Sequence, residues 1–451
     1  MKRNDKFVLE KIDNSIYLLP VGQMIAEYNK GIKINETCEF IWQQLEQEIS
    51  FDDLVGKCAE YFDAEEEDIE NLRKDIETLI RSLKDRGMLE GSQSIFKCSC
   101  SLCRNGDPVL SPKYTGFKED TDDISETVTK CQPEKVGSYV IGGLPVLFYG
   151  DDRYFYESFE EFKDKNDYTD DGFNSSSVMK IQVTNIEELF ENAENEGGFF
   201  DLEGEDADTE TSDIDQELRK EKNDTVLIHH NELTVLEYPE EYVLFFHSLS
   251  GIEELHLLKD GSCARFYCEQ PSDEVRLNLF YAIRIAFLIF ALNKNRVMLH
   301  SCSILFNEKV WAFSAPSGTG KSTHCGIWKK LFDTPVVNGD LNLIGLENGI
   351  PYVYGTPWCG TSGIFENRKR TLGGIILLKQ SSNNRIEALS EENKILYVQQ
   401  RLTTSVWDKK MLEQTLGIVS EIVKKIYVKR LYCNMEDEAG YLIHDDIVLS
   451  L

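Results

Sequence analysis

The first thirty residues alternate apolar and polar positions in the manner of strands in a small sheet. Two such runs, 7–12 and 15–19, flank Asp13-Asn14, a dipeptide that favours a tight turn between paired strands. A third short run follows from Met24 to Tyr28. We therefore expect a hairpin and a third strand, which together form a three-stranded sheet.

The next sixty residues change to the helical spacing of apolar positions. Asn35 and Ser50 are suitable N-caps for two successive helices, because their side chains can accept hydrogen bonds from the first free backbone N–H groups. A third helix is expected over about 66–86 and should end at Gly87. A small sheet with three helices is a winged-helix-like pattern, which we assign to residues 1–90.

Winged-helix domains commonly bind DNA, so the charge of the chain decides whether that function is plausible. The chain carries 79 Asp and Glu residues against 48 Lys and Arg residues, a net charge of −31. Neutralisation of phosphates by Lys and Arg supplies most nonspecific affinity for nucleic acid. The charge therefore argues against a nucleic-acid partner and equally against an anionic membrane surface.

Neither a signal peptide nor a membrane span is expected. The most apolar later run, Phe280 to Leu292, is short and contains Arg284, so it predicts a buried core helix. The start of the chain lacks the apolar core of a signal peptide. These features favour a cytoplasmic protein, in which most of the twelve cysteines are small core residues.

Residues 91–135 are polar and predict a linker, with one cysteine cluster inside it. Four thiolates can hold a structural zinc ion, although this spacing differs from the common paired C-x-x-C pattern. Reduced surface thiols are the alternative. The four cysteines are Cys98, Cys100, Cys103 and Cys131.

From about residue 136 to the C-terminus at 451, the pattern predicts a second, α/β domain. An acidic insertion interrupts it at about 150–224, where residues 201–217 hold nine acidic and no basic side chains. Such a composition buries too little apolar surface to offset chain entropy. Short strands and a helix over about 272–293 follow, and a strand then leads toward the segment that carries the clearest chemistry.

That segment combines a strand, a glycine-containing turn and a helix. Val310 to Phe313 is an apolar strand, and the helical pattern begins at Ser322. This order matches a P-loop, in which backbone N–H groups and a helix N-terminus hold phosphates, a Lys reaches the β- and γ-phosphates and a hydroxyl binds Mg²⁺. The first glycine of that pattern is replaced by Ala315. The predicted binding residues for ATP are Ser317, Gly318, Thr319, Gly320, Lys321, Ser322 and Thr323.

Further polar residues are expected near this loop. His300 ends an apolar strand one hairpin before the loop, and Asp340 follows Gly339 at a later strand turn. Asp340 can bind Mg²⁺ together with Ser322, or take a proton from an attacking hydroxyl. The alternatives are a structural histidine and an ordinary turn aspartate.

Two later segments have both a functional and a structural interpretation. The glycine-rich loop 355–363 contains Trp358, which either covers a bound substrate or simply packs. Arg368 and Arg370 belong to a dense basic run, and one of them could neutralise phosphoryl charge. A solvated loop is the alternative for this run.

Residues 5–90 resemble the PqqD-like domains that recognise leader peptides of ribosomally synthesised, post-translationally modified peptides. The segments that carry the resemblance are 31–37, 41–42, 61–63 and 83–90. The resemblance implies that a leader adds as a strand to the sheet edge, beside the third helix. The implied contact residues are Met24, Ile25, Tyr28, Leu72 and Ile76.

The remainder, strongest over His300 to Leu378, resembles the HPr kinase family, whose core is shared with ATP-using phosphoenolpyruvate carboxykinases. The resemblance implies that Lys321 and Ser322 bind phosphates and Mg²⁺, that His300 lines the catalytic pocket, and that Asp340 is the metal-linked or general-base carboxylate. Two features depart from the family: Gly339 stands where an aspartate is usual, and the loop 355–363 replaces a Glu-containing signature.

These features together predict an ATP-dependent kinase that phosphorylates Ser or Thr of a precursor peptide, with the leader held by the N-terminal domain. Two alternatives remain open at this point. One is a kinase of a folded, HPr-like carrier protein. The other is a non-catalytic adaptor that delivers the precursor to other enzymes and uses its nucleotide site as a switch.

Overall fold

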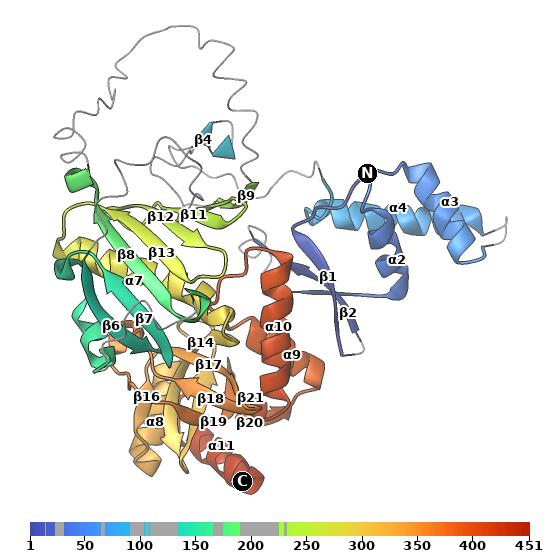
Figure 1. Ribbon diagram of the computed structural model, residues 1–451. Coiled ribbons are helices and arrows are strands. Elements are labelled where there is room, and N and C mark those ends of the chain that lie inside the picture. Colours follow the sequence, from blue (N-terminus) through green and yellow to red (C-terminus); the bar gives the residue numbers. More distant parts are fainter. Residues whose placement is uncertain are drawn as a thin grey trace, which may run out of the picture.

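The protein is a mixed α/β chain with a small N-terminal sheet, helices and two larger sheets (Figure 1). The computed structural model describes residues 1–13, 15–22, 31–64, 68–90, 103–104, 107–108, 134–165, 175–189, 225–229 and 232–451. Within the predicted linker 91–135, it describes β4 (Cys103–Arg104), which pairs with β5 (Asp107–Pro108), and the last two residues, 134 and 135. Cys98, Cys100 and Cys131 of the predicted zinc cluster, and the acidic run 201–217, lie outside these residues.

The N-terminal sheet has the strand order β1 (Phe7–Ile12), β2 (Ser15–Pro20), β3 (Ile32–Ile34). The predicted hairpin is confirmed, because Ile12 pairs with Ser15 across the turn. The third strand was predicted too early in the chain: the strand that pairs with β2 is β3. Met24, Ile25 and Tyr28, the residues predicted to form it, lie outside the described residues.

Three helices cover one face of this sheet: α2 (Glu36–Gln44), α3 (Phe51–Tyr61) and α4 (Ile69–Asp85). Both predicted caps are confirmed, since the Asn35 and Ser50 side chains accept hydrogen bonds from the backbone N–H groups of Cys38 and Asp53. On α4, Leu72 is partly buried, whereas Ile76 is 1% exposed and packs in the core. The prediction that Ile76 contacts a leader was therefore wrong, because the core of its own domain already occupies its side chain.

A large sheet forms the middle of the chain, in the order β6-β7-β8-β13-β12-β11-β10-β9. Its strands are β6 (Lys135–Ile141), β7 (Leu144–Tyr149), β8 (Met179–Asn185), β9 (Thr225–His229), β10 (Leu233–Glu237), β11 (Glu241–Phe246), β12 (Ile252–Leu258) and β13 (Cys263–Cys268). Strand β8 and the short 3-10 helices η1 (Asp152–Tyr154), η2 (Glu157–Phe162) and η4 (Ser175–Ser177) fall inside the predicted insertion 150–224. That boundary was therefore wrong: β8 lies between β7 and β13, and Tyr154, Phe159 and Phe162 are buried.

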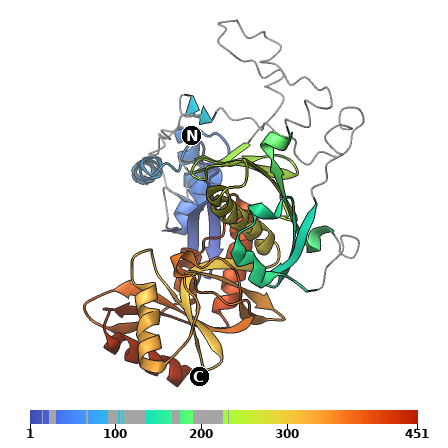
Figure 2. The same cartoon turned by 90° about the vertical axis from the view of Figure 1, so that its left-hand side faces the viewer.

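Helix α7 (Asp273–Leu292) contacts β8 and β12 of this sheet and also β14 (Arg296–Phe306) (Figure 2). Among the described residues it is the one helix long and apolar enough to span a membrane, by length and composition alone. Most of it is buried inside the protein, as 67% of its most apolar stretch is enclosed. This confirms the buried core helix predicted from Phe280 to Leu292.

The C-terminal part contains one eight-stranded sheet, in which the long strands β14 and β19 (Arg370–Gln380) change pairing partners along their length. The first half of β14 pairs with β17 (Leu341–Glu347), and its second half pairs with β15 (Lys309–Ser314) and β16 (Val336–Asn338). Strand β19 pairs with β18 (Ile350–Tyr354) at its start and then lies parallel to β15 and β21. The other elements are β20 (Arg385–Ala388), β21 (Tyr427–Cys433), α8 (Lys321–Phe332), α9 (Glu391–Gln399), α10 (Lys409–Val423), α11 (Asp437–Ser450) and η5 (Gly360–Ser362).

The second face of the N-terminal sheet packs against the C-terminal part, beside α10 (Figure 1). Val8 and Leu19 belong to the same apolar core as residues of α9 and α10. The Glu392 carboxylate of α9 accepts a hydrogen bond from Ser15 Oγ at 3.0 Å and forms an ion pair with Lys33 Nζ at 3.2 Å. The N-terminal domain is thus held against α9 by apolar packing and by one shared carboxylate.

A buried charged group in the large sheet makes stability depend on pH. The Nδ1 and Nε2 atoms of His256 lie 3.2 Å from a Glu241 oxygen and 3.3 Å from a Glu254 oxygen. Burial opposes the charge of His256, but the hydrogen bonds and charges of the two glutamates together raise its pKa. The charged imidazole therefore stabilises the fold fully below the unfolded-state pKa of about 6.5, and this contribution is lost as pH rises through the folded-state pKa.

We predict that His256→Gln lowers the free energy of unfolding at pH 6 by roughly 3 kcal/mol, because two buried carboxylates lose their cation. Above the folded-state pKa of His256 the wild-type ring is neutral, so the difference between the two proteins should shrink. Denaturant unfolding of both proteins at pH 6 and at an alkaline pH measures this. An equal loss at both values would show that His256 is not charged in the fold.

Candidate functional site

The loop between β15 and α8 has the backbone shape that anion binding requires. Gly318 and Gly320 have φ angles of +73° and +105°, in the left-handed region that glycine tolerates best. Gly320 also precedes the first residue of α8 and makes no side-chain cap. The first N–H groups of α8 are therefore available to an anion at the helix N-terminus.

Ala315 does not distort this loop. Its φ angle is not among the positive ones of the described residues, so position 315 does not need glycine here. The Ala315 methyl is fully buried in an apolar cluster with Phe313 and Trp328. Its carbonyl oxygen accepts a long hydrogen bond from Lys321 Nζ at 3.5 Å, which draws the lysine back across the loop.

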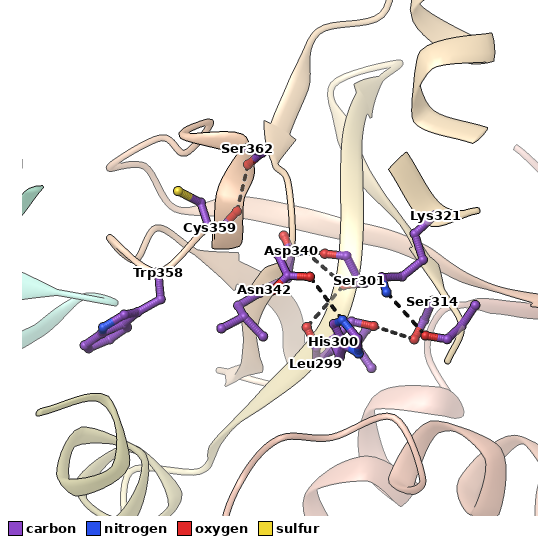
Figure 3. A network of polar contacts seen from close by, with 12 residues as sticks. Leu299, His300, Ser301, Ser314, Lys321, Asp340, Asn342, Trp358, Cys359 and Ser362 are labelled. Carbon is purple, nitrogen blue, oxygen red and sulfur yellow. Dashed lines mark hydrogen bonds and ion pairs between the residues drawn. The ribbon is translucent and has the colours of Figure 1, made fainter. Parts of the chain in front are cut away.

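His300 and Asp340 meet beside the loop, as the sequence predicted (Figure 3). His300 Nε2 lies 3.0 Å from Asp340 Oδ1. The hydrogen bond from His300 lowers the pKa of Asp340; burial opposes this, and the charges of His300, Lys321 and Arg284 add to it. Asp340 is therefore a carboxylate at neutral pH, able to accept a proton or to bind a cation.

The turn that presents Asp340 is fixed by Asn338. The Asn338 side-chain oxygen accepts hydrogen bonds from the N–H groups of Asp340 and Leu341, both at 2.9 Å. Its amide nitrogen donates to the carbonyl oxygen of Trp358 at 3.2 Å. One buried side chain thus connects the turn at Asp340 to the glycine-rich loop 355–363.

The same loop explains why position 339 is a glycine. A Cβ atom at Gly339 would lie 2.0 Å from Ser362 Oγ, and one at Gly360 would lie 2.9 Å from Asp340 Oδ2. Ser362 Oγ is itself held by the carbonyl oxygen of Cys359 at 2.7 Å. The loop therefore packs directly on the turn and leaves no room for a second carboxylate.

Strand β14 is anchored to its neighbours by buried polar contacts that keep His300 in place. Asn342 Nδ2 donates to the Ser301 carbonyl oxygen at 2.6 Å, and Ser303 Oγ donates to Asn342 Oδ1 at 2.7 Å. Ser314 Oγ donates to the His300 carbonyl oxygen at 2.7 Å. Because these groups are buried away from water, the loss of any one hydrogen-bond partner would lower the free energy of unfolding. The contacts therefore hold the strand in one register.

Lys321 is a nearly buried cation in this pocket, with 8% of its surface exposed. Burial lowers its pKa, and the Asp340 carboxylate partly offsets that effect. In contrast, the other loop residues around the lysine are more accessible. The exposed ones are Ser317, Gly318, Ser322 and Thr323, and the half-buried ones are Thr319 and Gly320. The structure therefore gathers His300, Lys321 and Asp340 and leaves the rest of the loop open to a ligand.

Two arginines that the sequence analysis did not assign act on the charges of this site. The carbonyl oxygen of Arg401 accepts a hydrogen bond from the His300 N–H at 2.9 Å, and its guanidinium acts on the charge of Lys321. Arg284, on α7, acts on the charge of Asp340. Within the described part of the chain, neither guanidinium has a hydrogen-bond or ion-pair partner, although both are half-buried and burial lowers the pKa of each. A charged residue inside an apolar helical run was the available signal for Arg284, whereas Arg401 had no local signal.

The surroundings of Arg368, Arg370 and Trp358 differ from those that the functional interpretation of the sequence predicted. Arg370 donates from Nε and Nη2 to one Glu366 oxygen at 2.9 and 2.7 Å, and Arg368 is exposed. Among the described contacts, neither arginine touches His300, Lys321 or Asp340. Trp358 is 1% exposed and donates from Nε1 to the Phe280 carbonyl oxygen at 3.1 Å, so it packs against α7 and does not cover a ligand.

The donor set around the loop suits a hard cation. Asp340 supplies an ionised carboxylate and Ser322 an exposed hydroxyl at the start of α8, and oxygen ligands of this kind are the ones Mg²⁺ prefers. Over the described residues there is no preformed group of three or more His, Cys, Asp or Glu side chains that would hold a metal by itself. A magnesium ion here would accordingly need phosphate oxygens to complete its coordination.

Comparison with known proteins supports the N-terminal assignment and adds little elsewhere. No curated protein matches the chain. Among solved structures, the Hpr(Ser) kinase/phosphatase from Coxiella burnetii matches with 10% sequence identity over 34% of this chain and 97% of that chain, but its TM-score of 0.19 is too low to support a conclusion. Residues 19–89 match the family model of coenzyme PQQ synthesis protein D (PqqD). The N-terminal resemblance is thereby confirmed, and this part of the chain is a PqqD domain.

Proposed function

We propose that this protein is an ATP-dependent kinase that phosphorylates a Ser or Thr of a ribosomally synthesised precursor peptide, whose leader the PqqD domain binds. The observation that carries the proposal is the pocket that joins the Asp340 carboxylate, bound to His300, with Lys321 at the end of a P-loop. A carboxylate of lowered pKa next to a phosphate-binding lysine is the arrangement that phosphoryl transfer to a hydroxyl needs. On the basis of the same residues, we assign the C-terminal part of the chain to an HPr kinase-like core.

In this proposal each residue has a distinct task. Asp340 accepts the proton of the attacking hydroxyl, and His300 Nε2 holds the carboxylate in position. The N–H groups at the start of α8 and Lys321 bind the phosphates. Mg²⁺, held by Ser322 and Asp340, would neutralise phosphate charge. Arg284 and Arg401 have free donors beside Asp340 and Lys321, so we assign to them the charge stabilisation first expected of Arg368 or Arg370.

The PqqD domain supplies the peptide specificity in this proposal. Strand β3 is paired on one side only among the described strands, so its other edge can accept an added strand. Lys33 on β3 contacts Glu392 at the start of α9, and the chain after α9 reaches Arg401 and His300. A leader held at this edge raises the effective concentration of its core segment near the site.

Lys321→Met tests the assignment of the P-loop. We expect phosphoryl transfer to the precursor to fall by roughly 100-fold or more, because a preorganised cation is lost, while leader binding stays unchanged. Lys329→Met, on the exposed side of the same helix, is the matched control and should retain activity. A wild-type protein that binds leader and nucleotide but transfers no phosphoryl group would instead identify an adaptor.

The hydrogen bond between His300 and Asp340 predicts a shift in pH dependence. Since this bond lowers the pKa of Asp340, the base stays ionised down to a pH below the ordinary carboxyl range. In His300→Ala the pKa of Asp340 rises, so the acid limb of kcat/KM should move to higher pH. Rates measured from pH 3 to 8 test this, and an unmoved limb would exclude Asp340 as the base.

The two unpaired arginines provide a third prediction. Arg284→Met and Arg401→Met should each lower kcat by about 100-fold, because each removes a cation that acts on Asp340 or Lys321, where phosphoryl charge develops in this proposal. Arg370→Met should lower kcat far less, since Arg370 is already neutralised by Glu366. Steady-state kinetics with the precursor peptide decides this, and the reverse order of effects would restore the basic run 368–370 to the site.

A further inference from the structure

A depression of about 450 Å³ opens at the carboxyl ends of β19 and β21. These two strands and β15, which leads into the P-loop, are parallel neighbours. Ligands of parallel α/β sheets bind outside the carboxyl ends of the strands. The depression therefore lies at the edge of the sheet where the phosphate-binding loop also begins. It is lined by Gln380, Ser381, Ser382, Cys433, Asn434 and Met435.

Met435 joins this depression to the P-loop. A Cβ atom placed on Gly320 would lie 2.0 Å from Met435 Cε and 2.8 Å from its sulfur, so the methionine side chain rests directly on the loop glycine. Met435 nonetheless keeps 42% of its surface exposed. It thus offers an exposed, polarisable surface between the phosphate site and the depression.

The lining chemistry suits an uncharged, planar group with polar edges. None of the six lining side chains carries a formal charge, and burial raises the pKa of the Cys433 thiol to about 11, so it stays neutral. Gln380 and Ser382 are exposed and present amide and hydroxyl groups. A thioether packs well against aromatic rings. A further phosphate or carboxylate would find no cation here among the lining residues.

The depression is also built on a fixed frame. The Ser381 N–H donates to the Cys433 carbonyl oxygen at 3.0 Å, which ties the end of β19 to the end of β21. The Asn434 N–H donates to Asn384 Oδ1 at 2.9 Å, and Asn434 Oδ1 accepts from the Glu436 N–H at 3.2 Å. These bonds hold the two loops in register before any ligand arrives.

We propose that this depression binds the base and ribose of the nucleotide whose phosphates occupy the P-loop. The base stacks on Met435, and Gln380 and Ser382 contact its polar edge or the ribose hydroxyls. The volume is within the range of about 300–1,000 Å³ that small-ligand sites occupy. The inference rests on the proposed function, because it takes the phosphates to lie on residues 317–323.

Comparison of ATP with inorganic triphosphate separates this subsite from the P-loop. In the full-length wild-type protein with Mg²⁺, we expect ATP to bind at least about tenfold more tightly than triphosphate, as measured by calorimetry. Ser382→Trp places a large ring in the depression from an exposed bend, so it should remove this difference and leave triphosphate affinity unchanged. Ser248→Trp, at an exposed bend of the large sheet, is the matched control and should preserve the difference.

A second variant keeps the test independent of how the tryptophan is accommodated. Gln380→Ala removes only an exposed amide and should weaken ATP by about threefold without affecting triphosphate. Equal wild-type affinities for the two ligands, or an unchanged preference for ATP in both variants, would overturn the subsite while leaving the P-loop intact. Failure of the wild-type protein to bind either ligand would instead remove the proposed function, and this inference with it.

Discussion

The contact between His300 and Asp340 is the constraint around which the C-terminal part is arranged. His300 stands on β14 where the pairing partner of that strand changes from β17 to β15, and Asp340 precedes β17. The Ser301 N–H donates to the Asp340 carbonyl oxygen at 2.8 Å, so backbone and side chain hold the same pair. Buried polar contacts of Asn338 and Asn342 then fix both partners. The free-energy cost of desolvating so many polar groups is offset only when all of them are paired. The site therefore has one geometry.

The segment from α9 to the start of α10 connects this site to the N-terminal domain. Glu392 holds Ser15 and Lys33 at one end of α9. Beyond the other end, Arg401 and Leu402 pair with His300 and Leu299, and the Val406 carbonyl oxygen accepts a hydrogen bond from the Gly22 N–H. The same stretch of chain therefore touches the PqqD sheet and the strand that carries His300. A peptide held at the sheet edge and a phosphoryl donor on the P-loop would be positioned by one common element.

The sequence predicted features that depend on residues close together in the chain. It did not predict features that depend on contacts between distant segments. Helix caps at Asn35 and Ser50 and the turn glycines Gly318 and Gly320 follow from local backbone needs, so they were found. Strand β8 does carry a local signal, since Met179, Ile181 and Val183 alternate with polar residues, but the polar and acidic composition around it outweighed that alternation. Arg401 was missed for a different reason, since its place beside His300 arises from a pairing about a hundred residues apart in the chain. Trp358 and Arg370 look functional in sequence, yet α7 and Glu366 occupy them.

The most direct test of a leader-guided peptide kinase is mass spectrometry of a candidate precursor peptide after incubation with the protein, ATP and Mg²⁺. The expected result is a gain of one phosphoryl group on a Ser or Thr of the core segment, which becomes far slower when the same core is supplied without its leader. Equal phosphorylation with and without the leader would contradict the role of the PqqD domain. No phosphorylation of a precursor that binds tightly would contradict the kinase itself.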